Sequence, residues 1–277
     1  MNTHPDLSGC FENQSQHLFS VSDFFYILRI YACIQTARGI KYGSRIRVNG
    51  IHFEWRIAMK SQSFRTACLV IFISILLLPV LSSAQEHVTV QLPEPQTDGG
   101  KPLMRALQDR MSSRAYSSEP LPEQVLSNLL WAAFGVNRAD SGKRTAPSAV
   151  NWQETDIYAA MPDGLYLYHA ASHALERILA RDIRALTGKQ AFVKDAPLNL
   201  VFVADFSKMG NAAPDDKIFY SAADAGFISQ NVYLYCASEG LATVVRGLVD
   251  RTALAEAMNL RPDQKIILAQ TVGYPAK

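Results

Sequence analysis

The spacing of apolar residues predicts several helices after residue 100. In each of these segments the apolar positions recur every three or four residues, so one face of the helix would be buried. Pro122 and Gly135 bound the clearest segment, as expected where helices favour proline at the start and glycine at the end. A later segment carries few charges and predicts a buried helix with Gly240 as its C-cap. The predicted helices lie within residues 101–111, 121–135, 175–186, 221–244 and 251–260.

Alternating or continuous apolar runs predict strands between these helices. Asp163-Gly164 is a pair typical of tight turns, and the runs on either side of it predict a hairpin. Another run is apolar nearly throughout, as expected for a buried central strand. The predicted strands are residues 156–161, 165–170, 199–206 and 265–275, with a loop at 136–153. Because helices and strands are mixed without regular alternation, the pattern predicts an α+β domain.

Residues 59–84 have the pattern of a cleaved export signal. Lys60 and Arg65 form a basic start, residues 67–81 are almost wholly apolar, and Ser82-Ser83-Ala84 supplies small residues for cleavage. The apolar run is shorter than the roughly 20 residues that span a bilayer, so no stable membrane anchor is expected. We therefore predict an exported, periplasmic or secreted protein whose signal peptide is Met59–Ala84.

The predicted signal divides the chain into parts. Residues 1–58 precede it and are interpreted as a leader or a non-native upstream extension. Removing residues 1–84 leaves 193 residues, the length of one domain. We divide this mature part into an extended arm with a short alternating strand, residues 85–100, and a domain of residues 101–277.

Charge and cysteine content argue against a nucleic-acid partner and exclude an internal disulfide in the mature domain. The chain of 277 residues is 48% hydrophobic, enough for a core, and carries a formal charge of +2. From Gln85 onward, however, 19 lysines and arginines face 21 acidic residues, a net charge of −2. No basic excess remains for nucleic acid. Cys236 is the one cysteine of the mature sequence, so that domain must fold without an internal disulfide.

Common catalytic and metal-binding signatures are absent from the sequence. It contains no GxGxxG, GxSxG or HExxH, and residues 135–144 have the wrong glycine spacing for a phosphate-binding loop. His169 and His173 lie four apart but have no third ligand nearby, so we expect solvent-facing histidines and no metal site. Cys236 lies among apolar residues, which predicts a packed, inert thiol.

The stretch RMSSRAY, residues 110–116, brings two arginines and two serines together without an acid. One interpretation is a solvated helix end whose arginines cap carbonyl groups. The other is a phosphate clamp, because guanidinium groups match phosphate oxygens and hydroxyls add further donors. The stretch alone leaves both interpretations open.

Several motifs occur in an order that resembles a known family. They are R-x-S-x-R-x-Y (110–116), LLWAAFGVNR (129–138), APSAVNWQ (146–153), ISQNVYL (228–234), EGLATVVRG (239–247) and VGYP (272–275). Together they resemble the nitroreductase-like flavoprotein family, and most of all its branch near the thiazoline oxidases of peptide-modifying clusters. The resemblance covers residues 101–277.

The resemblance implies an α+β homodimer with a mixed sheet flanked by helices, which binds FMN at the subunit interface. By motif matching, Arg110, Ser112 and Arg114 would contact the phosphate, the ribityl chain and the pyrimidine side of FMN. A second set would pack on the flavin from the other subunit or bind it through hydrogen bonds and backbone N–H groups near N5. This set is Pro147, Ser148, Ala149, Asn151, Arg246 and Gly247.

Two departures from the family pattern bear on cofactor binding. Family members commonly carry a basic pair after the last strand that closes on the phosphate, whereas this chain ends in VGYPAK and offers Lys277 alone. Ala242 also stands where the family usually has glycine. Phosphate affinity would therefore depend more on Arg110 and Arg114.

The resemblance implies an FMN-dependent oxidoreductase that transfers hydride or electrons in ping-pong fashion to a small organic acceptor, such as a nitroaromatic or a quinone. Family members usually draw electrons from NAD(P)H, which is scarce outside the cytoplasm, so a protein or quinone-linked donor is expected for an exported protein. Two alternatives stay open. They are a thiazoline-type peptide heterocycle dehydrogenase and a non-catalytic exported flavin-binding module.

Overall fold

The computed structural model describes residues 46–48, 51–53 and 88–276. The chain divides into two compact units, Met1–Ser83 and Ala84–Lys277. In the first unit, β1 (Ile46–Val48) and β2 (Ile51–Phe53) form an antiparallel pair. The predicted signal peptide, most of the predicted leader and Lys277 lie outside the described residues.

One seven-stranded sheet forms the centre of the second unit. Its strands follow the order β10-β11-β9-β6-β7-β8-β3, and all six neighbouring pairs are antiparallel. The strands are β3 (Thr89–Gln91), β6 (Thr155–Met161), β7 (Gly164–His169), β8 (Ala174–Leu179), β9 (Leu198–Asp205), β10 (Ala242–Arg246) and β11 (Gln264–Gly273). The α+β prediction is confirmed, and the strand directions refine the expected mixed sheet into an antiparallel one.

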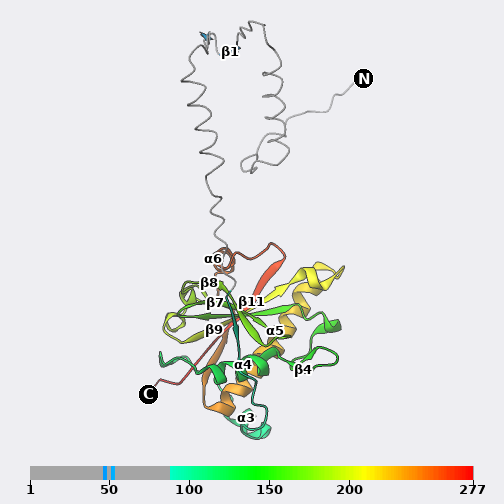
Figure 1. The fold of residues 1–277 in the computed structure, drawn as a ribbon, viewed down its shortest axis with the longest axis vertical. Helices are drawn as coiled ribbons and strands as arrows, with labels where there is room; N and C mark the ends of the chain where they lie inside the picture. The colour runs from blue at the N-terminus through cyan, green and yellow to red at the C-terminus, as the bar shows by residue number, and fades with distance from the viewer. Residues whose placement is uncertain (1–45, 49–50, 54–87, 277) are drawn as a thin grey trace, which may run out of the picture. The chain divides into compact units, whose positions relative to one another are not determined.

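Helices cover both faces of this sheet. One face packs against α4 (Glu123–Phe134) and α5 (Pro214–Glu239), with α3 (Leu103–Asp109) lying on α5; the other face packs against α6 (Arg251–Ala257) (Figure 1). Single 3-10 turns connect the elements at η1 (Ala149–Asn151), η2 (Arg184–Leu186), η3 (Ala191–Lys194) and η4 (Phe206–Met209).

Strand β9 shows why the sheet needs helices on both faces. All eight of its residues are buried, as predicted for a central strand. Successive side chains of a strand point to opposite faces. Leu200 and Phe202 therefore join the core under α4 and α5, while Val201 and Val203 join the core under α6.

Helix α5 begins earlier than the apolar spacing predicted. Pro214 stands in its first turn, followed by Asp215 and Asp216, which suit the positive end of the helix dipole. The helix ends as predicted at Gly240, whose φ of 70° is left-handed. Its 26 residues make α5 the longest described element, and several of the predicted cofactor residues lie against it.

Two sequence-based assignments need correction. The helix predicted for residues 175–186 is wrong: the segment forms β8, which pairs with β7 and β3, followed by η2. The loop predicted for 136–153 contains a small hairpin of β4 (Val136–Arg138) and β5 (Lys143–Arg144). The hairpin around Asp163-Gly164 is confirmed, because β6 and β7 pair on either side of it.

Candidate functional site

The stretch from Arg110 to Tyr116 leaves the end of α3 and crosses to β10. Arg110 is the C-cap of α3. The Ser113 N–H then donates to the Thr243 carbonyl on β10 at 2.9 Å, and the Tyr116 hydroxyl donates back to the Ser113 carbonyl. These bonds hold the backbone between the two arginines against the edge of the sheet.

Tyr233 on α5 contacts two of the predicted cofactor residues. Its hydroxyl lies 2.8 Å from Ser112 Oγ, and the guanidinium carbon of Arg110 lies 5.2 Å from the centre of its ring, within the range of a cation–π contact. The same hydroxyl accepts the Val245 N–H at 3.0 Å. Tyr233 thus connects α5, the arginine stretch and β10.

Neither Arg110 nor Arg114 forms an ion pair with a carboxylate within residues 88–276. Arg105, one turn earlier in α3, does contact Asp109 at 3.5 Å. Ser112 and Arg114 are both exposed. The cations of this stretch are therefore not neutralised by neighbouring acids and are available to an external anion. This favours the phosphate clamp over the solvated helix end.

The C-terminal tail runs beside the arginine stretch. Ser117 N–H donates to the Tyr274 carbonyl at 2.9 Å, and Ala276 N–H donates to the Ala115 carbonyl at 3.2 Å. The tail thus passes next to Arg114 where the family would place its closing basic pair. The predicted contribution of Lys277 itself lies outside the described residues.

The part of the second predicted set within residues 147–151 lies on a loop with unusual backbone angles. Val150, Asn151 and Gln153 have φ values of 51°, 58° and 48°, in a region that residues other than glycine rarely adopt. Val150 is 81% exposed although it is apolar. The loop therefore holds an unfavourable conformation and presents an apolar side chain to its surroundings.

Two buried carboxylates hold this loop. Asp224 on α5 accepts the Ala149 N–H at 2.9 Å, and Glu154 accepts the Ser148 hydroxyl at 3.2 Å. Ser148 Oγ in turn accepts the Gln153 N–H at 2.8 Å. Burial, and next the neighbouring Asp224, raise the pKa of the Glu154 carboxyl above its ordinary value.

Arg246 turns its side chain into the protein. Its guanidinium donates to the Thr187 carbonyl at 2.6 Å and to Asn199 Oδ1 at 2.9 Å, while Nε has no hydrogen-bond partner in the described part of the chain. Burial lowers the pKa of this group to about 10. The Arg246 side chain is thus engaged inside the protein, whereas Gly247 beside it is exposed.

Within one chain, the arginine stretch and the loop of residues 147–151 are held at different positions along α5. The arginine stretch is held by Tyr233, and the loop is held by Asp224, nine residues earlier on the same helix. At 1.5 Å per residue these positions are about 14 Å apart along α5. A cofactor that contacts both groups would need them from different subunits or would have to span this distance.

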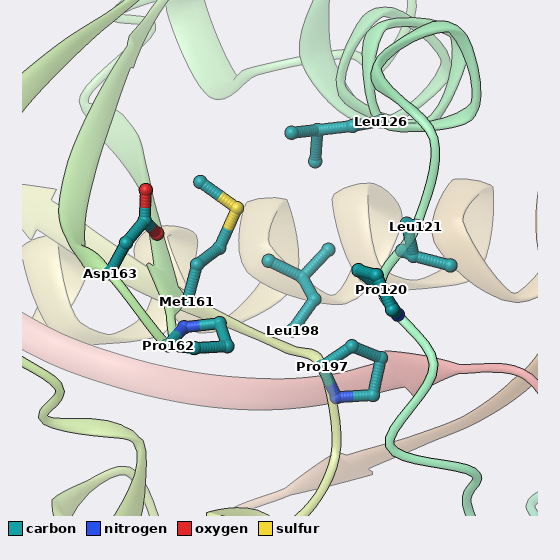
Figure 2. Close-up of a pocket in the computed structure, with 8 residues that line it drawn as sticks. All are labelled: Pro120, Leu121, Leu126, Met161, Pro162, Asp163, Pro197 and Leu198. Atoms are coloured by element: carbon teal, nitrogen blue, oxygen red, sulfur yellow. The ribbon is translucent and has the colours of Figure 1, made fainter.

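A further apolar cavity is lined by other residues. It has a volume of about 280 Å³, and Figure 2 shows the side chains of Met161 and Leu198 pointing into the same space. Its lining is Pro120, Leu121, Leu126, Met161, Pro162, Asp163, Pro197 and Leu198. None of the predicted cofactor residues lines this cavity, so it gives no support to the site assignment.

The histidines and the cysteine occupy structural positions. His169 pairs with Glu176 Oε2 at 2.7 Å. The prediction of a solvent-facing His173 is wrong, because its ring lies 2.7 Å from Ser127 Oγ and 2.9 Å from the Tyr168 hydroxyl. Cys236 is fully buried and free, and burial raises the pKa of its thiol, which confirms the packed thiol.

Sequence reasoning missed Tyr233, Glu154 and Asp224 as parts of the site. Tyr233 lies inside the ISQNVYL motif, and Glu154 directly follows APSAVNWQ. Asp224 is an isolated acid in an otherwise apolar stretch, which is a recognisable signal because a buried acid needs a partner.

Comparisons with known proteins find relatives of this chain. The profile of the Nitroreductase family matches residues 107–274. A candidate nitroreductase of Methanocaldococcus jannaschii is 33% identical over 162 residues, which are 55% of this chain and 81% of that protein. An FMN reductase [NAD(P)H] of Bacillus subtilis is 23% identical over 188 residues, 63% of this chain and 66% of that protein. The crystal structure of a candidate nitroreductase from Ralstonia eutropha is 49% identical, covers 68% of this chain and 90% of its own, and has a TM-score of 0.66.

Proposed function

This chain belongs to the Nitroreductase family and is an FMN-dependent oxidoreductase by that membership, and we propose that it reduces a small organic acceptor in a ping-pong reaction. The acceptor class is a nitroaromatic, a quinone or a similar compound. FMN supplies the reversible uptake of two electrons and a proton, and the chain binds the cofactor and admits donor and acceptor in turn.

The observation that carries the proposal is the pair of arginines without acids. Arg110 and Arg114 flank the exposed Ser112, and neither forms an ion pair among residues 88–276. A charge-assisted hydrogen bond contributes roughly 1.5–3 kcal/mol, so two guanidiniums and a hydroxyl suffice to hold a phosphate monoester. This donor set fits the phosphate of FMN.

The loop from Pro147 to Asn151 fits a planar ring system. Its left-handed backbone presents the apolar Val150, and the Asn151 amide nitrogen makes no hydrogen bond within the described residues. We assign Pro147, Ser148 and Ala149 to packing on the ring and Asn151 to a hydrogen bond with it. The backbone N–H groups of Arg246 and Gly247 would approach its reactive edge.

A homodimer would bring the two groups into one site. The outer surface of α3, the segment directly after it and the first turns of α5 expose large apolar side chains, among them Met104 (75%), Met111 (67%) and Phe219 (67%). Monomers rarely expose such side chains in groups. A second copy packed on this surface would cover them and would supply the loop of one subunit to the arginines of the other.

Export is part of the proposal. The basic start, the apolar run and the small residues before Gln85 support Met59–Ala84 as the signal peptide. Among the described residues, we find no helix with the length and apolar character of a membrane span.

Outside the cytoplasm a protein or a quinone-linked compound would be the electron donor. Rapid turnover of NADH by the purified protein would remove the reason for a special donor.

The oxidative half-reaction, measured by itself, tests the proposed reaction. The FMN-loaded protein is reduced without oxygen, freed of excess reductant and mixed with a nitroaromatic or a quinone. We expect the oxidised flavin spectrum to return at a rate that depends on acceptor concentration. A reduced flavin that no acceptor reoxidises would overturn the proposal. Reduction of the oxidised, FMN-loaded protein by a thiazoline, which loses two electrons and two protons to become a thiazole, would favour the peptide heterocycle alternative.

A further inference from the structure

The hydroxyl of Tyr233 has two polar neighbours, one that donates to it and one with which the direction of the bond is open. It accepts the Val245 N–H at 3.0 Å and lies 2.8 Å from Ser112 Oγ. A phenol carries one hydrogen to donate. The direction of the bond to Ser112 therefore decides where the hydrogens of both hydroxyls go.

Only one direction of the hydrogen bond between Tyr233 and Ser112 leaves no buried donor unpaired. If Ser112 donated to Tyr233, the phenol hydrogen would have no acceptor within the described residues, although Tyr233 is 7% exposed. A buried donor without a partner is unfavourable. If Tyr233 donates to Ser112 instead, the hydrogen of the exposed Ser112 stays available to a ligand.

Resting on the proposed function, we propose that Tyr233 is a positioning residue for the cofactor phosphate, because its hydroxyl donates to Ser112 Oγ and thereby directs the Ser112 hydrogen outward to a phosphate oxygen. Its ring also supports the Arg110 guanidinium from 5.2 Å. The side chain thus orders one hydroxyl and one cation of the clamp without touching the phosphate.

The same hydroxyl ties the clamp to β10. Val245, whose N–H it accepts, directly precedes Arg246 and Gly247. Tyr233 therefore fixes the arginine stretch and the end of the strand that would face the reactive edge of the ring. Removal of its oxygen is expected to loosen both.

The test compares Tyr233→Phe with Tyr235→Phe in the complete chain. Tyr235 lies on the same helix, but its hydroxyl donates to the Val125 carbonyl of α4 at 3.3 Å and does not contact the clamp. FMN and riboflavin, which lacks the phosphate, are the two ligands. We expect Tyr233→Phe to weaken FMN binding about tenfold and riboflavin binding by no more than about twofold. Tyr235→Phe should change neither affinity. An equal loss for FMN and riboflavin would overturn the assignment.

A double-mutant cycle with Ser112→Ala tests the hydroxyl pair directly. Once Ser112 is alanine, Tyr233→Phe should weaken FMN binding much less than in the unaltered chain, because the two changes remove one shared interaction. Arg114→Ala combined with Tyr233→Phe should be close to additive. Additive effects of the Ser112 and Tyr233 changes would contradict the proposal.

Hydrogen exchange in the FMN-free protein separates this inference from the proposed function. Tyr233→Phe should accelerate exchange of the Val245 amide, whereas Ser112→Ala should leave it slow. Unchanged exchange in Tyr233→Phe would overturn the tie to β10. An unaltered chain that binds riboflavin and FMN equally would overturn the phosphate role of Ser112 while leaving flavin binding intact. A chain that binds neither flavin would contradict the proposed function itself and, with it, the role of Tyr233.

Discussion

The Asp224 carboxylate accepts the Ala149 N–H at 2.9 Å and so fixes a loop whose backbone is otherwise unfavourable. Asp224 is 2% exposed, and Ala149 is partly buried. No ion pair of residues 88–276 neutralises this acid. A hydrogen bond to a charged acceptor at this place stabilises the left-handed turn that carries Asn151.

Asp224→Ala is expected to loosen this loop. Loss of the bond leaves the Ala149 N–H without its acceptor, so amide exchange at residues 149–153 should accelerate and FMN affinity should fall about tenfold. Hydrogen exchange and fluorescence titration with FMN measure the two effects. Asp216→Ala, at the exposed start of the same helix, is the matched control and should change neither. Unaltered exchange in Asp224→Ala would show that the loop keeps its conformation without the bond to Asp224.

Glu154→Gln is expected to change how stability depends on pH. Burial raises the pKa of the Glu154 carboxyl above the ordinary value of 4.5, so between these two values the folded state binds more protons than the unfolded state. The free energy of unfolding therefore falls through this group as pH rises. Glutamine has no such proton, so the variant should gain stability relative to the unaltered protein as pH rises through the range between the two pKa values. Urea unfolding across this range measures the difference, and parallel curves would contradict a raised pKa.

Arg114→Ala is expected to weaken FMN binding by about tenfold or more, because a charge-assisted bond to phosphate is lost. Riboflavin affinity should hardly change. Arg105→Ala is the control, since Arg105 is exposed and paired with Asp109 in the same region. The salt dependence of FMN binding should also become weaker in Arg114→Ala. If Arg105→Ala had the same effect, general charge and not a defined clamp would explain the affinity.

Gly188→Ala is expected to destabilise the domain. An added Cβ would collide with Nη1 of Arg246, which cannot move freely because it donates to Thr187 and Asn199. Overpacking of this kind costs about 1–3 kcal/mol, measurable as a lower midpoint of unfolding. Gly210→Ala is a poor control because φ is positive there, whereas Gly226→Ala meets no neighbouring atom and should be tolerated. Equal midpoints for Gly188→Ala and the unaltered protein would show that Arg246 can be displaced.

Cys236 is expected to react with thiol reagents only when the domain unfolds. The side chain is fully buried, and burial raises the pKa of its thiol, so almost no thiolate is present or accessible. In a protein of residues 85–277, which has this one cysteine, labelling should follow the unfolding rate in denaturant. Fast labelling without denaturant would contradict the packing of α5 against the sheet.

Local patterns predicted most elements but failed where distant pairing decides. The segment 175–186 has apolar residues that fit a helical face, yet Leu175 and Ile178 belong to β8, which pairs with strands on both sides. Strand formation depends on these cross-strand partners more than on intrinsic preference. The apolar pattern also did not predict strand β10, because this strand is only five residues long and follows almost directly after the C-cap of α5.

The arginine stretch was predictable because its chemistry is local, whereas its supports were not. Ser112 and Tyr233 lie 121 positions apart in the sequence, and Ala149 and Asp224 lie 75 apart. No periodicity within a short window connects such residues. The sequence therefore indicates which groups could bind a phosphate, and the fold shows which side chains hold those groups in place.

The most direct test of the account is whether the purified domain, residues 85–277, retains FMN. Its visible absorption spectrum is recorded before and after addition of FMN and desalting, together with its size in solution. We predict a retained flavin spectrum in a dimer, lost in Arg110→Ala combined with Arg114→Ala. A folded domain that retains no flavin would contradict the central claim that the two unpaired arginines hold the phosphate of FMN.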